Sequence, residues 1–143
     1  MLEPSFGMIG VLSEKIAVHD KSRLHAHNVP IDALVRINQC FHIIYTSMVL
    51  HHIPDTESVI SKCYRLLSPG GRLVVIDLMK EDGSFHGNDP HYEGHNGFNP
   101  DKLADILSSC GFVDTAWHEF YADRKTAGGK DVDYSLFILH GRA

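Results

Sequence analysis

Cysteine and tryptophan are scarce in this chain of 143 residues, which holds three cysteines and one tryptophan. Cys40, Cys63 and Cys110 are far apart in the sequence and odd in number. A disulfide framework is typical of short secreted chains with an even set of cysteines, so this pattern predicts reduced thiols instead. Cys63 and Cys110 fall on apolar faces of expected helices, which favours their burial. We therefore expect a cytoplasmic protein.

Positive charge and long apolar runs are also lacking. Lys and Arg together number 13 against 18 for Asp and Glu, so the formal net charge is −5. This balance provides no general basic face, and we expect no nucleic-acid partner. We also expect no signal peptide and no membrane partner, because no apolar run is long enough to span a bilayer. The length predicts a single domain over residues 1–143.

The chain is organised around residues 41–78, FHIIYTSMVLHHIPDTESVISKCYRLLSPGGRLVVIDL. Residues 41–46 are apolar or β-branched, which predicts a strand buried on both faces. Asp55 can cap a following helix whose apolar positions share one face: Val59, Ile60, Cys63, Leu66 and Leu67. Residues 68–71, Ser-Pro-Gly-Gly, end that helix, and residues 72–78 predict a second buried strand. Such a β-α-β unit joins parallel strands, and ligands bind beyond their carboxyl ends.

Shorter signals place the remaining elements. Ser5 can cap a helix that continues to about Ala17. Asn99 can cap a second helix, with Pro100 at its first position and Gly111 just past its end. Two further strands are expected at residues 112–121 and 134–140, joined by a polar loop at residues 122–133. They predict an antiparallel hairpin that closes the sheet.

The central stretch resembles the class I S-adenosylmethionine (SAM)-dependent methyltransferases, in the branch that modifies small molecules such as quinones. The likeness rests on F-x-I-I-Y-T-S-M-V-L-H-H-I-P-D paired with L-L-S-P-G-G-R-L-V-V-I-D. It implies an α/β fold, a Rossmann-like three-layer sandwich whose mostly parallel sheet ends in an antiparallel hairpin. It also implies methyltransferase activity, SAM as the cofactor and a small-molecule methyl acceptor.

The resemblance implies four cofactor-binding residues. Glu3 falls where the family has an acid that hydrogen-bonds the ribose hydroxyls, and Asp32 is the nearest candidate beside the adenine. Thr46 and Ser47, at the end of the first strand of the unit, would line the methionine part of the cofactor. The alternatives are a solvated acid near the terminus for Glu3 and plain strand-end hydroxyls for Thr46 and Ser47. We expect Glu3, Thr46 and Ser47 to line one crevice, with Asp77 at the end of the adjacent strand.

No glycine-rich turn of the kind that follows the family's first strand occurs in the sequence. The pairs Gly70-Gly71 and Gly128-Gly129 fall in a strand-entry turn and in the hairpin loop. The sequence thus predicts an incomplete domain without the first strand and most of the second. We expect either a third strand, residues 24–29, or a second molecule of a homo-oligomer to cover the edge of strand 41–46. A truncated, non-catalytic remnant or partner subunit is the alternative function.

Histidine can act as a base near neutral pH, and the candidates follow the strand end or lie in a loop expected over the substrate. We call residues 81–97 the covering loop. The catalytic candidates are His51, His52, His86 and His95. The alternative for each is an imidazole that holds a turn or is simply solvated. The spacing of His86, His91 and His95 also permits a metal-binding protein, but it matches no tight zinc motif, and we assign no metal site.

Overall fold

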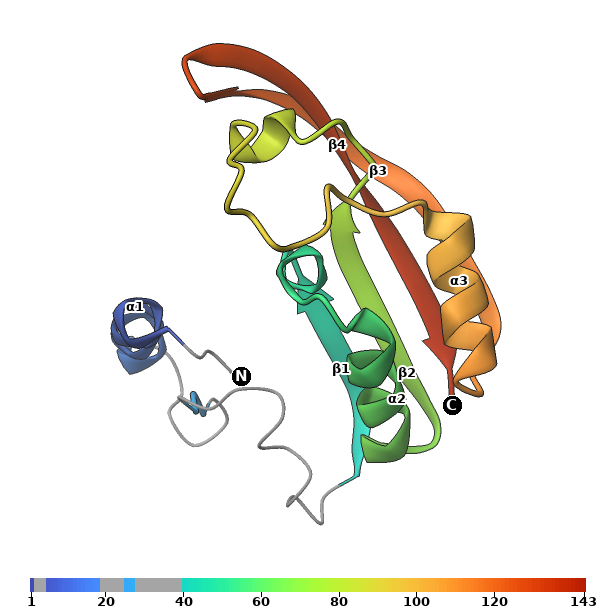
Figure 1. Cartoon of the computed structure of the whole chain (residues 1–143). Coiled ribbons are helices and arrows are strands. Elements are labelled where there is room, and N and C mark those ends of the chain that lie inside the picture. The colour runs from blue at the N-terminus through green and yellow to red at the C-terminus, as the bar shows by residue number, and fades with distance from the viewer. Residues whose placement is uncertain (2–4, 19–24, 28–39) are drawn as a thin grey trace. The chain divides into compact units, whose positions relative to one another are not determined.

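The computed structural model describes residues 1, 5–18, 25–27 and 40–143 (Figure 1). They belong to two compact units, Met1–Asn38 and Gln39–Ala143. Residues 24, 28 and 29, half of the predicted strand at residues 24–29, lie outside the described residues, as do the cofactor candidates Glu3 and Asp32.

Helix α1 (Phe6–Ala17) is the main element of the first unit. As predicted, the Ser5 side chain caps it by accepting a hydrogen bond from the backbone N–H of Met8, at 3.4 Å. None of the residues of α1 is buried, although its apolar stripe is half-buried at Ile9, Leu12 and Ile16. The cap and the apolar period are therefore the features that define this helix.

The second unit is a four-stranded sheet with two helices. Its strands are β1 (Phe41–Ser47), β2 (Leu67–Leu78), β3 (Val113–Ala127) and β4 (Lys130–Arg142), in the order β1-β2-β4-β3. β1 and β2 are parallel, as predicted, whereas β2–β4 and β4–β3 are antiparallel. The sheet of residues 40–143 is therefore mixed, and the prediction of a mostly parallel sheet is wrong for these residues. The predicted C-terminal antiparallel hairpin is confirmed.

Helices α2 (Thr56–Leu66) and α3 (Pro100–Ser109) cover one face of this sheet (Figure 1). Residues 40–143 thus supply two layers of the predicted three-layer sandwich. The core between them is apolar and includes Ile60, Leu73, Leu103, Phe137 and Leu139, each at most 1% exposed. In α3 the Asn99 side chain accepts a hydrogen bond from the backbone N–H of Lys102, as the predicted cap requires.

The β1-α2-β2 unit forms much as the sequence predicts. The Asp55 side chain caps α2 by accepting a hydrogen bond from the Ser58 backbone N–H, at 3.1 Å. The buried residues of α2 include Cys63, which is a free thiol, and burial raises its pKa to about 11. α2 leads directly into β2, so residues 68–71 form an irregularity inside the strand instead of a separate turn. Gly71 is required there because an added Cβ would lie 3.0 Å from the Phe41 carbonyl oxygen.

Strand β1 is not buried on both faces, which corrects one prediction. Ile43 and Tyr45 are each 63% exposed. Within residues 40–143, β1 is the edge strand of the sheet, and its apolar sequence is therefore only partly covered. The apolar run identified the strand correctly, but a sequence pattern cannot state how many neighbours a strand has.

The hairpin is longer than predicted, because residues 122–127 and 130–133 continue its strands. Only Gly128 and Gly129 form the connection, and both have positive φ, as a tight type I′ hairpin turn requires. The residues of this extension are mostly polar, and most of them are exposed on both faces of the hairpin. Cross-strand pairs stabilise it instead, since Arg124 Nε donates to Asp133 Oδ1 at 2.6 Å and Thr126 Oγ1 to Asp131 Oδ1 at 3.0 Å.

The covering loop starts and ends at neighbouring points of the sheet. Met79 and Phe98 form a parallel bridge, the Lys80 N–H donates to the Phe98 carbonyl, and the Glu81 N–H donates to the Asn96 carbonyl. Its regular part is a short 3₁₀ helix, Ser84–His86, between Gly83 and Gly87, which both have positive φ. The result is a compact loop with joined ends that lies above the carboxyl ends of β1 and β2 (Figure 1).

Candidate active site

The carboxyl ends of β1 and β2 meet at one edge of the sheet. Thr46 and Ser47 are in register with Val75 and Ile76 of the parallel neighbour, so Asp77 follows at the same end. Thr46, Ser47 and Asp77 therefore lie at the same end of adjacent strands, as predicted, whereas the crevice stays a prediction and Glu3 lies outside the described residues. Beyond β1 the chain forms a short 3₁₀ helix, Leu50–His52, which turns back over β2.

Asp77 joins the two strand ends through its side chain, which is fully buried. Its Oδ2 accepts a hydrogen bond from the Leu50 N–H at 3.0 Å, and its Oδ1 accepts one from the Leu78 N–H at 2.8 Å. His51 Nδ1 lies 2.5 Å from Oδ1, and the His51 side chain is 1% exposed. Because a carboxylate only accepts, Nδ1 carries the shared proton, and Nε2 is the ring nitrogen left for other contacts.

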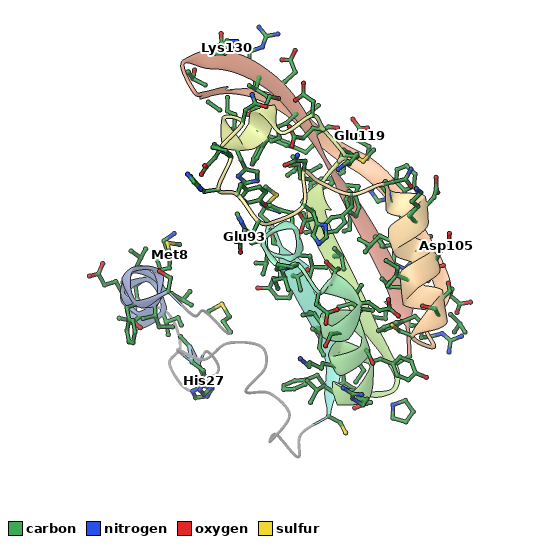
Figure 2. All side chains as sticks on the ribbon, in the orientation of Figure 1. Met8, His27, Glu93, Asp105, Glu119 and Lys130 are labelled. Atoms are coloured by element: carbon green, nitrogen blue, oxygen red, sulfur yellow. The ribbon has the colours of Figure 1, made fainter. Side chains whose placement is uncertain are left out.

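The covering loop holds the backbone of His51 from the other side. The His51 carbonyl accepts hydrogen bonds from the Tyr92 hydroxyl at 2.8 Å and from the His95 N–H at 2.6 Å. A Cβ added at Gly94 would lie 2.3 Å from the same carbonyl oxygen, so the loop passes too close for any other residue. Figure 2 labels Glu93 on this loop, where it meets the turn after β1.

His95 uses its ring to hold the turn that precedes α2. Its Nε2 lies 3.1 Å from the carbonyl oxygens of Ile53 and Pro54 and 3.2 Å from Thr56 Oγ1. A nitrogen that faces two carbonyl oxygens must donate, so Nε2 carries a proton. The ring thereby links the covering loop to the start of α2.

The remaining rings pack together above His51. His52 and His86 lie 4.1 Å and 5.3 Å from it between ring centroids, and His86 stacks on Tyr92 at 3.9 Å. Burial and the neighbouring imidazoles lower the pKa of His52 and of His86. Burial and the charges of Asp77 and Glu81 raise the pKa of Tyr92 to about 12. Near pH 7 His52 and His86 therefore offer neutral imidazoles, and Tyr92 offers a protonated phenol.

Thr46 and Ser47 are the cofactor-binding candidates that lie within the described residues. The hydroxyl oxygen of Thr46 is buried and has no hydrogen-bond partner among the residues that the structure describes. Ser47, the last residue of β1, is exposed. An unpartnered buried hydroxyl at a strand end is suited to a ligand group that accepts or donates a hydrogen bond there.

Two contributions at this site were not expected from the sequence. Asp77 was identified only as the end of a strand, although a carboxylate at the end of the apolar run of residues 73–78 is itself a signal of a buried polar network. Tyr92 carried no signal, because an aromatic residue in a polar loop has no characteristic period. Within the described part of the chain, no group of three or more His, Cys, Asp or Glu residues is arranged to hold a metal ion, so His86, His91 and His95 do not form one.

Comparison with known proteins agrees with this fold. A family model described as "Methyltransferase domain" matches residues 1–73. An uncharacterized methyltransferase of Schizosaccharomyces pombe is 36% identical over 77 residues, 49% of this chain and 27% of its own length. Phosphoethanolamine N-methyltransferase 2 of Caenorhabditis elegans is 27% identical over 117 residues, 78% of this chain and 26% of its own length. The chain thus spans about a quarter of these curated relatives.

A solved structure shows the same fold. Phosphoethanolamine N-methyltransferase 2 of Haemonchus contortus, in complex with phosphomonomethylethanolamine and S-adenosylhomocysteine, aligns with 99% of this chain and 42% of its own, with a TM-score of 0.77 and 14% identity. The chain belongs to the class I SAM-dependent methyltransferases, a family of transferases that use SAM.

Proposed function

We propose that the chain provides the acceptor side of a SAM-dependent methyltransferase that acts on a small molecule. The observation that carries this proposal is the buried Asp77–His51 pair, because it fixes a histidine where the carboxyl ends of two parallel strands meet. A methyl transfer needs an acceptor held in position, water excluded and, where the acceptor carries a proton, a base. SAM supplies the methyl group when it is bound.

The described residues divide these tasks among them. Thr46 and Ser47 would contact the methionine part of SAM at the end of β1. The covering loop would exclude water, since it lies on the His51 carbonyl through Tyr92 and His95. His51, His52 and His86 are the proton acceptors that the geometry supports, whereas the Nε2 of His95 is committed to the turn before α2.

A second function is the non-catalytic one, a remnant or a partner subunit. The observation in its favour is that the 143 residues contain no glycine-rich turn to cradle the cofactor. The two functions share the fold and differ in SAM binding. In both cases we propose a cytoplasmic location, which is supported by three free cysteines.

Label transfer decides between the two functions. The chain would be incubated with methyl-labelled SAM at millimolar concentration and with catechol, phosphoethanolamine or a small thiol, and labelled product would be measured by mass spectrometry. We expect product from at least one acceptor and a loss of at least about tenfold in His51→Gln, because it breaks the buried Asp77–His51 pair that holds this end of the site in position. The matched control is His118→Gln, which changes an exposed histidine of β3. A folded chain that labels none of these acceptors would favour the non-catalytic function.

A further inference from the structure

One ring nitrogen of the histidine cluster has no partner. His86 Nε2 is buried and makes no hydrogen bond to any of the residues that the structure describes. Buried polar atoms are nearly always paired, and leaving one unpaired costs about 1–3 kcal/mol, so an unpaired atom calls for an explanation. In two neighbouring histidines one ring nitrogen already has a hydrogen-bond partner. His51 Nδ1 bonds Asp77, and His95 Nε2 bonds backbone oxygens.

The position of this nitrogen is fixed by the surrounding rings. His86 stacks on Tyr92 with 3.9 Å between centroids and an interplanar angle of 19°. It meets Phe85 edge-on at 5.1 Å, and Tyr92 is in turn bonded to the His51 carbonyl. His86 therefore cannot turn freely toward solvent without breaking the stack that anchors the covering loop. The His86 ring is therefore held in place, while its Nε2 has no hydrogen-bond partner among the described residues.

The charges around His86 disfavour a positive group. The Lys125 ammonium lies 3.7 Å from the centroid of the Phe85 ring. Burial lowers the pKa of His86 most, and His51, His52 and Lys125 lower it further, whereas Glu81 alone opposes them. Because the Lys125 ammonium already lies on the Phe85 ring, which contacts His86, a second positive group at this partly buried place is disfavoured. A neutral imidazole there can accept a hydrogen bond from a neutral donor.

We infer that His86, through Nε2, is the residue that touches the methyl acceptor, and that the acceptor presents a weakly acidic hydroxyl or thiol at this point instead of an ammonium group. This inference rests on the proposed function, because it names the acceptor class of the same site. Tyr92 is then a positioning residue that sets the plane of the His86 ring. The acceptor's O–H or S–H donates a hydrogen bond to Nε2, which accepts it as a neutral imidazole nitrogen.

Two matched probes test the acceptor class. Phenol and benzylamine share a benzene ring, but near pH 7.5 phenol carries a weakly acidic hydroxyl and benzylamine an ammonium group. The 143-residue chain with ¹³C-labelled histidine would be titrated with each probe, and the His86 ring signal would be identified by its loss in His86→Phe. We expect phenol to shift the His86 signal saturably and benzylamine to leave it in place. Equal or tighter binding of benzylamine at His86, or no phenol shift, would overturn the inference.

Variants of His86 test whether Nε2 is the atom that binds the acceptor. His86→Phe keeps a ring on Tyr92 but removes Nε2, and we expect it to weaken phenol binding at least tenfold. His91→Phe changes an exposed histidine of the same loop and serves as the matched control, with phenol affinity unchanged. If circular dichroism shows that His86→Phe does not fold, His86→Leu makes the same comparison. Unchanged phenol binding in a folded His86 variant would contradict the inference. SAM binding is measured separately by calorimetry, so its failure would count against the proposed function while the phenol titration still decides the acceptor class.

Discussion

The carboxylate of Asp77 accepts hydrogen bonds from two backbone N–H groups and from His51 in a place that solvent does not reach. Asp77→Asn keeps the shape but replaces an acceptor oxygen with an NH₂ group and removes the charge. We expect it to lower the free energy of unfolding by about 2–4 kcal/mol, measured by urea denaturation. Asp105→Asn, on the exposed surface of α3 (Figure 2), is the control and should change it by less than about 0.5 kcal/mol. Equal stability of the two variants would show that the Asp77 network does not stabilise the fold.

The lowered pKa values of His52 and His86 predict how stability depends on pH. Both groups bind protons more weakly in the folded chain than at their ordinary value near 6.5, so the unfolded chain binds more protons in this range. The free energy of unfolding should therefore fall as the pH is lowered from about 7 through 6.5 and toward the folded pKa values. We expect the double variant His52→Gln/His86→Gln to flatten this slope between pH 7.5 and 5, and His118→Gln to leave it unchanged. A double variant with the slope of the parent chain would contradict the assignment.

The four histidine candidates show how far residue types alone could predict the site. The sequence placed His51 and His52 after a strand end and His86 and His95 in the covering loop, and the structure brings all four to one edge of the sheet. The sequence could not show which ring nitrogens already have hydrogen-bond partners, because that depends on the path of the covering loop in space. Asp77 binds His51 Nδ1 from 26 positions away, and the carbonyl oxygen of Ile53 faces His95 Nε2 from 42 positions away.

At the scale of the elements, the covering loop depends on one close approach, Gly94 against the His51 carbonyl. Gly94→Ala places a methyl group where only a hydrogen fits, so the loop must move away and the bond from the His95 N–H to His51 must lengthen. We expect amide exchange at His95 to speed up at least about tenfold, measured by hydrogen-exchange NMR. Exchange at Leu107 in the core of α3 should stay close to that of the parent chain. Unchanged protection at His95 would mean that the loop tolerates the contact.

Local signals predicted the helices better than the strands. The caps Asp55 and Asn99 form as expected, because a cap is a contact within four residues. The hairpin was predicted too short, since polar residues in a strand that is exposed on both faces resemble a loop in sequence. The partial exposure of β1 could not be predicted either, since it depends on which strands lie beside it.

For the whole chain, the lack of a glycine-rich turn predicts weak cofactor binding. We expect a dissociation constant for SAM above roughly 1 mM, a binding free energy weaker than about −4 kcal/mol, in calorimetric titration of the 143-residue chain. Low-micromolar binding would show that another backbone segment or a partner chain supplies the missing contacts. S-adenosylhomocysteine, titrated in parallel, tests whether the methyl group matters for that affinity.

The edge strand β1 predicts self-association. Its seven residues include no Lys, Arg, Asp, Glu or Pro, which are the residues that usually protect an edge from pairing with another chain. Light scattering at several concentrations should show a mass that rises with concentration, and Tyr45→Lys should suppress the rise. Phe120→Lys, at an exposed position of the opposite edge strand β3, is the matched control. A monodisperse monomer at all concentrations would contradict this prediction and leave cover by residues 24–29 as the alternative.

The three thiols differ in how far solvent reaches them. Cys40 is exposed, Cys110 is half-buried, and Cys63 is buried between α2 and the sheet with a pKa of about 11. An alkylating reagent should therefore modify Cys40 in the native chain and reach Cys63 only in molecules in which α2 has separated from the sheet. The rate at which Cys63 is modified then measures how often that helix opens. The chain thus carries its own reporter of local unfolding, without an added label or an engineered cysteine.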